Sequence, residues 1–266
     1  MASVYSANNP AGYEQLMGRW SRRLAPLFID FAAVRDGTSI LDVGCGTGSL
    51  TFALLEAFPT AQIKGLDYSQ AFIDYASSKA LADGRLVFEQ GDAAALPYED
   101  QAFDAALSLL VLNFVPDAQK AARELVRVTR LGGVVAAAVW DFKGGLTHMR
   151  VLADTAAALD PSGEAFRARL FSGPFTGLGE LSSAWIAMGL RDVVQTSLTI
   201  RMEFASFSDY WEPLLAGQGF VGAYVQNLTD EQRRLIEPYL LLAYCAGDAD
   251  GPRSFTATAW ACRGVR

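Results

Sequence analysis

The sequence places a glycine-rich turn and two carboxylates where they could together bind one small ligand. Three glycines at alternate positions, in "GCGTG" at 44–48, follow a short apolar run and precede a helix-like stretch. Asp67 ends the next apolar run, about 20 residues beyond the glycines, and its two oxygens match the cis diol of a ribose. Asp92 ends a third run, where a carboxylate can accept from an adenine amino group while the N–H of Ala93 donates to the ring. Together these features predict a site for an adenosine with a short charged tail.

The glycine spacing alone leaves other ligands open. A phosphate-binding loop needs a lysine directly after its last glycine, and none follows Gly48. A dinucleotide fold has a third glycine where this chain has Ser49. Asp67 still fits a dinucleotide or any adenosine cofactor, and the glycines alone also fit a tight turn that binds nothing.

The elements that must position these residues alternate between strand and helix. Apolar runs without a polar face, separated by helical segments, indicate a parallel sheet that is covered on both faces. Ser69 and Asp117 are expected to cap two of the helices, and Gly132-Gly133 to end the second of them. The expected strands are 39–43, 61–67, 85–92, 103–112 and 134–140, and the expected helices are 49–58, 69–82 and 118–131.

The segments outside this alternation predict a covering layer on a single domain. Residues 1–38 are expected to form a helical lid, because Tyr13, Met17, Trp20 and Leu24 share one helix face. Residues 39–266 are expected to form the main domain. Two stretches, 141–185 and 206–247, are predicted as insertions that cap the site. Further strands are expected at 192–200 and 254–264, and a capping box at Thr229-x-x-Gln232.

Composition excludes several classes of protein. The chain has 266 residues, 51% of them hydrophobic, and a net charge of -7 with few basic residues in runs, so a surface that tracks nucleic-acid phosphates is not expected. Its three cysteines are far apart in the sequence, which predicts neither a disulfide framework nor a zinc cluster and favours a reducing cytoplasm. We find no signal-peptide pattern and no apolar run long enough to span a membrane.

Four stretches, in order, resemble the class I S-adenosylmethionine-dependent methyltransferases. They are "LDVGCGTG", "GLDYS", "GDAAALPYEDQAFDAALS" and "RVTRLGG", all between Ser39 and Asp141. The nearest group is the type-11 methyltransferase domain of the small-molecule branch, which includes quinone-biosynthesis C-methyltransferases. The resemblance implies an α/β fold with a Rossmann-like seven-stranded sheet, mostly parallel, helices on both faces and an antiparallel last strand. It implies S-adenosyl-L-methionine as cofactor, S-adenosyl-L-homocysteine as product, and no metal.

The same resemblance assigns cofactor contacts by position. The glycine turn would approach the methionine part, Asp67 the ribose and Tyr68 the adenine ring, while Asp42 would support the amino group through the loop or water. The expected contacts are Gly44, Cys45, Gly46, Asp67 and Tyr68, with Asp92 and Ala93 at the adenine edge and Ser108 and Leu109 beside the methionine part.

Two segments rich in aromatic residues are expected to roof the site. The N-terminal helix would bring Tyr13 over the cofactor and Arg19 to its carboxylate, with Arg22 as the alternative partner. The 206–247 segment would complete the acceptor pocket. Aromatic faces near a sulfonium cation are favourable, so this arrangement suits the transferred methyl group.

The expected reaction is in-line methyl transfer to an oxygen, nitrogen or carbon nucleophile of a small molecule. Asp141, His148 and Tyr210 are the candidate bases, although a lone histidine is expected to be solvated and proximity alone could suffice. Sequence signatures of nucleic-acid amino and cytosine-C5 methylation are absent. The rival functions are a non-catalytic adenosine-cofactor-binding protein, a nicotinamide-dependent oxidoreductase, and an enzyme that uses the same cofactor for other chemistry.

Overall fold

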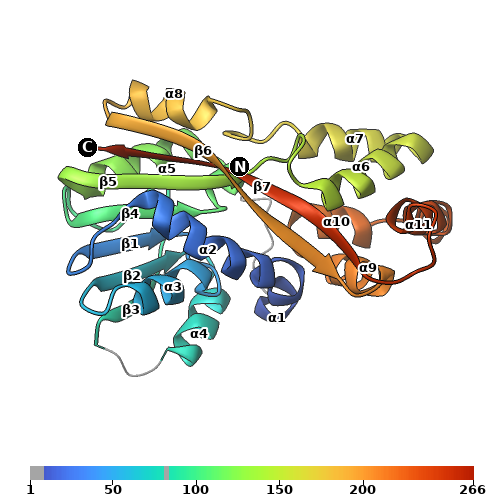
Figure 1. The fold of residues 1–266 in the computed structure, drawn as a ribbon, viewed down its shortest axis with the longest axis horizontal. Coiled ribbons are helices and arrows are strands. Elements are labelled where there is room, and N and C mark those ends of the chain that lie inside the picture. Colours follow the sequence, from blue (N-terminus) through green and yellow to red (C-terminus); the bar gives the residue numbers. More distant parts are fainter. Residues whose placement is uncertain (1–8, 81–83) are drawn as a thin grey trace.

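The strands form one mixed sheet in the computed structural model, which describes residues 9–80 and 84–266 (Figure 1). Within these residues the sheet has seven strands in the order β3-β2-β1-β4-β5-β7-β6. Neighbours from β3 to β5 run parallel, and β7 runs antiparallel to both β5 and β6. The strands are β1 Ser39–Val43, β2 Gln62–Asp67, β3 Leu86–Gln90, β4 Phe103–Leu109, β5 Thr129–Trp140, β6 Arg191–Phe204 and β7 Arg253–Val265. The expected sheet with an antiparallel last strand is confirmed.

Both faces of the sheet are buried, which explains the continuous apolar strands. Successive residues of β1 join different cores: Ile40 packs with α2 and α3 on one face, and Leu41 packs with α5 and α8 on the other. The helices and helical turns are α1 Pro10–Tyr13, η1 Glu14–Gly18, α2 Arg19–Ala32, α3 Ser49–Ala57, α4 Gln70–Lys79, η2 Leu112–Phe114, α5 Ala118–Val128, α6 Thr147–Leu159, α7 Pro161–Leu170, α8 Glu180–Ala187, α9 Phe207–Leu215, α10 Gly219–Gln226 and α11 Asp230–Cys245. Figure 1 shows α6, α7, α9, α10 and α11 gathered at one end of the sheet.

The predicted helix caps are confirmed, with one difference at a helix end. The Ser69 hydroxyl accepts from the N–H of Phe72, Asp117 accepts from Lys120, and the capping box at Thr229 is formed. Helix α5 ends at Val128, however, and not at Gly132-Gly133. The glycine pair lies within β5, where a β-carbon at Gly133 would come 2.6 Å from the carbonyl oxygen of Asp104, so the close packing of β5 requires a glycine there.

The N-terminal helical segment divides between core and site. Trp20 and Leu24 of α2 are buried in the main core, whereas Tyr13 and Met17 line a cavity. Removing residues 1–30 would therefore strip core packing as well as the expected lid. No helix among the described residues is long and apolar enough to cross a membrane.

Candidate functional site

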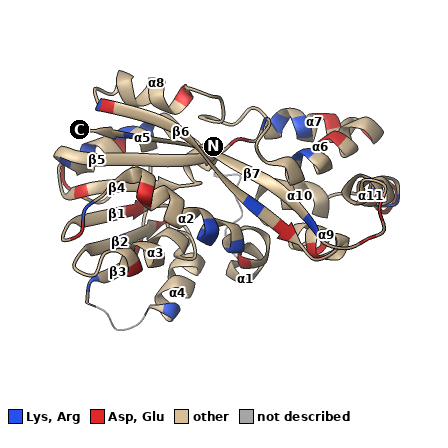
Figure 2. Ribbon diagram, viewed as in Figure 1, with Lys and Arg blue, Asp and Glu red and all other residues tan. Residues whose placement is uncertain are grey.

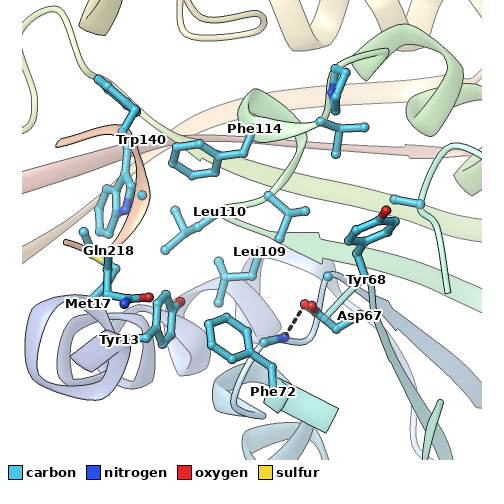
Figure 3. Close-up of a pocket in the computed structure, with 18 of the residues that line it drawn as sticks. Tyr13, Met17, Asp67, Tyr68, Phe72, Leu109, Leu110, Phe114, Trp140 and Gln218 are labelled. Atoms are coloured by element: carbon cyan, nitrogen blue, oxygen red, sulfur yellow. Dashed lines mark hydrogen bonds between the residues drawn. The ribbon is translucent and has the colours of Figure 1, made fainter. Parts of the chain in front are cut away.

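A cavity of about 450 Å³ opens where the carboxyl ends of the parallel strands meet the N-terminal segment and α10 (Figure 3). Parallel sheets commonly bind ligands at this edge. In Figure 3, Asp67 and Tyr68 lie to one side, Tyr13, Met17, Trp140 and Gln218 to the other, and Leu109 and Leu110 between them. We call two groups of its lining residues the polar half (Gly44, Gly46, Asp67, Tyr68, Asp92 and Ala93) and the apolar chamber (Tyr13, Leu16, Met17, Leu110, Phe114, Trp140, Phe142, Met149, Gln218, Phe220 and Val221).

The glycine turn forms one wall of the polar half. The N–H groups of Gly44 and Cys45 donate to the carbonyl oxygen of Leu66 at 2.7 and 3.0 Å, which fixes the turn to β2. Gly44 has a φ of +77°, and a β-carbon there would overlap the γ-carbons of Val111. Gly44 and Gly46 line the cavity, while the side chain of Cys45 is buried behind them and contacts no part of it. The turn therefore offers backbone rather than side chains to a ligand.

Asp67 joins the glycine turn to the start of α4. One carboxylate oxygen accepts from the N–H of Gly46 and the other from the N–H of Ser69, both at 2.9 Å. Burial raises the pKa of this carboxyl above its ordinary value, against the opposing effect of the two hydrogen bonds. The carboxylate is thus held in place at the cavity wall before any ligand arrives.

Asp92 and Tyr68 complete the polar half. Asp92 accepts from the N–H of Ala94 at 2.8 Å, so its carboxylate is fixed beside the exposed end of β3. Tyr68 is 70% exposed, which is unusual for a large aromatic ring and leaves its face free for a flat ligand. Both line the same cavity as Asp67.

Asp42 lies beneath the glycine turn and is 1% exposed. One of its carboxylate oxygens accepts from the Thr51 hydroxyl at 2.6 Å, and the other has no hydrogen-bond partner among the described residues. Burial raises the pKa of Asp42 to about 7, and the nearby Asp67 adds to this effect. A buried carboxyl with a free oxygen suits a cationic group reached through the turn or through water.

Asp42 also gives protein stability a defined pH dependence. The unfolded carboxyl ionises near pH 4, about three units below its folded value. Between these values the folded chain holds more protons, so stability falls as pH rises, by up to about 1.4 kcal/mol per unit. Asp42→Asn removes this loss and keeps an oxygen for Thr51. In urea unfolding, the free energy of unfolding of the variant minus that of wild type should therefore increase from pH 5 to pH 8. A difference that does not change with pH would contradict this assignment.

The apolar chamber contains aromatic rings and almost no polar groups. Trp140, Phe142 and Phe220 contribute rings from the end of β5, the loop that follows it and α10. The charged residues that line the cavity come from the ends of β2 and β3 and from the start of α5. Among the described residues, none comes from η1, β5, α6 or α10.

Three expected cofactor contacts, Arg19, Cys45 and Ser108, do not line the cavity. The Arg19 guanidinium pairs with Asp209 at 2.9 Å and stacks on Trp20, so it does not face the cavity. Its alternative, Arg22, pairs with Glu14. The Ser108 hydroxyl is fully buried and donates to the carbonyl oxygen of Val43 at 3.0 Å, so it holds β4 to β1 instead of lining the cavity.

The three candidate bases also lie outside the cavity lining. Asp141 accepts from the N–H groups of Lys143 and Gly144, which closes a turn after β5. His148 is buried rather than solvated, and burial, helped by Arg19, lowers its pKa to about 3. Tyr210 is 2% exposed and donates to the His148 carbonyl oxygen, and burial raises its pKa well above the ordinary value. These side chains serve packing and turn formation.

Sequence reasoning missed the residues that shape the apolar chamber. Gln218 is 4% exposed and lies at the cavity wall just before α10. A glutamine between two glycines, Gly217 and Gly219, was the available signal for it. Leu110 and Phe114 follow β4, where no motif distinguished them from core residues.

Comparison with known proteins identifies the fold and the domain. The family described as "Methyltransferase domain" matches residues 41–137. Demethylmenaquinone methyltransferase of Staphylococcus aureus is 36% identical over 129 residues, which cover 48% of this chain and 52% of that protein. The chain thus matches the curated relatives over about half of their length.

Solved structures share the fold at low sequence identity. The YcgJ protein of Bacillus subtilis matches 92% of this chain and 98% of its own, with 21% identity and a TM-score of 0.56. Phosphoethanolamine N-methyltransferase 2 of Haemonchus contortus, solved with phosphomonomethylethanolamine and S-adenosylhomocysteine, matches 99% of this chain and 58% of its own, with 17% identity and a TM-score of 0.60. The [4+2]-cyclase SpnF matches 98% and 85%, with 20% identity and a TM-score of 0.58. The resemblance drawn from the four sequence stretches is confirmed: residues 41–137 match a methyltransferase domain, and the chain is similar to a demethylmenaquinone methyltransferase over about half of that protein and shares the fold of the solved structures.

Proposed function

We propose that the protein transfers a methyl group from S-adenosylmethionine to an uncharged small molecule. The observation that carries this proposal is a single cavity whose polar half suits the cofactor and whose apolar chamber lies next to it. The polar half fits by its own chemistry: side-chain-free backbone at Gly44, a fixed carboxylate at Asp67, and a free oxygen on Asp42 below the turn. These would meet the methionine part, the ribose and the amino group.

The chain's contribution to the reaction is positioning and the exclusion of water. When bound, S-adenosylmethionine supplies a sulfonium methyl group, and the electrons of the broken carbon–sulfur bond go to sulfur. Leu109 and Leu110, at the junction of the two halves, would press the acceptor against this carbon. Holding reactants about 3–3.5 Å apart and in line supplies much of the rate enhancement. The aromatic rings of the chamber exclude water and favour the positive charge.

A dedicated base is not part of the proposal. Asp141, His148 and Tyr210 do not line the cavity. Tyr13 lines the chamber, but burial raises the pKa of its hydroxyl to about 12, so it stays protonated at neutral pH. An acceptor that loses its proton to water, before or after methyl transfer, fits this chamber.

The named acceptors of similar proteins differ in charge, and the chamber favours one class. A phosphorylated amine such as the ligand of the Haemonchus enzyme needs cations; among the described residues that line the cavity, Lys120 at the start of α5 is the one cation, and none comes from η1, β5, α6 or α10. The staphylococcal relative is named for a demethylmenaquinone, whose ring is aromatic and uncharged. Rings such as Trp140 and Phe220 match that second class.

We further propose that residues 1–38 and the 206–247 segment act as the roof of the site. Leu16, from the first, and Val221, from the second, line the chamber together. Glu14 ties the first segment to the glycine turn, because its carboxylate accepts from the Thr47 hydroxyl at 2.5 Å. A ligand that shifts the glycine turn would thus also shift the N-terminal segment of the roof.

We also propose that the protein is cytoplasmic and does not bind nucleic acid. Cys45, Cys245 and Cys262 are buried free thiols, which suits a reducing compartment. Figure 2 shows basic residues scattered over several elements and mixed with acidic ones, without the continuous basic face that phosphate tracking needs.

The test is incubation with S-adenosylmethionine labelled at the methyl group and a panel of phenols, quinols, amines and carboxylic acids. We expect label in an uncharged aromatic acceptor, with one S-adenosylhomocysteine formed per methyl transferred. Cofactor binding without transfer to any member would favour a non-catalytic role. Consumption of an acceptor without label would favour other chemistry on the same fold.

A further inference from the structure

The apolar chamber holds one buried amide. Gln218 is 4% exposed, and among the described residues that line the chamber it is the one with a carboxamide side chain. Figure 3 shows it on the same side of the cavity as Tyr13, Met17 and Trp140. A polar side chain in such a dry space normally has a hydrogen-bonding reason to be there.

The local backbone holds this side chain at the chamber wall. Gln218 directly precedes α10, and its carbonyl oxygen accepts from the N–H of Gly222 at 3.1 Å. Gly217 has a φ of +74°, and a β-carbon there would overlap the side chain of Gln226. The turn therefore fixes the backbone of Gln218 at the chamber wall.

The amide oxygen of Gln218 is free to accept a hydrogen bond, whereas its nitrogen already donates one. Its nitrogen donates to the carbonyl oxygen of Ala216 at 3.5 Å, whereas its oxygen has no partner among the described residues. Leaving a buried oxygen unpaired is costly, and a group that can donate to it recovers that cost. A ligand hydroxyl or N–H is such a group.

We infer that Gln218 selects the methyl acceptor by accepting a hydrogen bond from it. The acceptor is then an uncharged aromatic molecule with a hydroxyl or N–H group, which fits the rings of the chamber and the single amide oxygen. This rests on the proposed function, since it concerns the acceptor side of that site. Sites built to bond a substrate hydroxyl strongly reject analogues that lack it, because the protein group is left unpaired.

The test is binding of a matched pair of probes, 1-naphthol and 1-methoxynaphthalene, to the full chain by calorimetry, with and without S-adenosylhomocysteine. Wild type should bind 1-naphthol about tenfold more tightly, or about 1.4 kcal/mol. Gln218→Leu should lose this preference by weakening 1-naphthol alone. It should also unfold at the same or a higher temperature than wild type, because an unpaired buried amide has been removed.

Gln119→Leu, an exposed glutamine of α5, is the matched control and should keep the full preference. A preference that survives in Gln218→Leu would overturn the inference, as would equal binding of the two probes to wild type or binding of neither. A destabilised Gln218→Leu that loses both probes equally would show a structural role instead. Failure of S-adenosylhomocysteine to bind would count against the proposed function, while the probe pair alone would still judge Gln218.

Discussion

Gly44→Ala is expected to weaken S-adenosylhomocysteine binding by at least about 100-fold, roughly 2.7 kcal/mol. The new β-carbon faces two separate costs. The φ of +77° strains any residue with a side chain by about 1–2 kcal/mol, and the carbon would overlap Val111. Relief would have to come from moving the turn, which is the wall of the polar half. Calorimetric titration with S-adenosylhomocysteine measures the effect.

Gly132→Ala separates these two costs. Gly132 has a nearly identical φ of +78°, but beyond its own residue and its two chain neighbours no described atom lies within 4 Å of a β-carbon placed there. This variant should lose stability and keep its affinity. Adding Val111→Ala to Gly44→Ala removes the two γ-carbons of Val111 and should restore part of the binding. The rescue should be incomplete, because the β-carbon at position 111 remains 2.8 Å from the new one. Equal affinity losses at Gly44 and Gly132 would show that the turn does not contact the ligand.

Asp67→Ala is expected to weaken S-adenosylhomocysteine binding tenfold to a hundredfold. A hydrogen bond to a charged acceptor is worth about 1.5–3 kcal/mol, so the expected range corresponds to a net loss of about one such bond from the ribose. The variant also leaves the N–H groups of Gly46 and Ser69 without their acceptor, which loosens the turn. The same titration measures this loss.

Asp74→Ala provides the control for Asp67. Asp74 is an exposed residue of α4, the helix that follows Asp67. Its carboxylate accepts a hydrogen bond from the side-chain amide of Gln70 at the surface. Its removal should leave affinity unchanged. A folded Asp67→Ala protein that binds S-adenosylhomocysteine as tightly as wild type would remove Asp67 from the site.

The fold was predictable because local signals agreed with the global arrangement. The apolar runs of β1 and β4 fit burial on both faces, and Ser69 and Asp117 fix helix starts within short sequence windows. The predicted end of α5 was wrong because a glycine pair such as Gly132-Gly133 also suits close packing inside a strand. A glycine pair in sequence does not say which of the two needs it serves.

The polar half was predictable for a similar reason. Gly44 and Asp67 lie at strand ends, and parallel strands bring these ends to one edge, so sequence order sets their neighbourhood. Arg19 and His148 were harder, since their surroundings depend on distant residues. Arg19 finds Asp209, 190 positions away, and His148 is buried against Phe204 and Tyr210.

Gln218 shows what remains hidden in a sequence of this kind. Its importance comes from an unpaired oxygen inside an apolar chamber, which is a property of the folded surroundings. The glycines on either side mark a tight turn, but any polar residue in a surface turn would look the same. Tertiary packing decides which of them turns inward.

The central claim, that the polar half binds the adenosine and amino-acid parts of S-adenosylmethionine, is tested most directly by isothermal titration calorimetry. The full chain is titrated with S-adenosylhomocysteine, NAD and ATP under the same conditions. The account predicts saturable binding of S-adenosylhomocysteine and no measurable binding of NAD or ATP, because the glycine turn lacks a lysine after Gly48 and Ser49 stands in place of a third glycine. Tighter binding of NAD than of S-adenosylhomocysteine would contradict it.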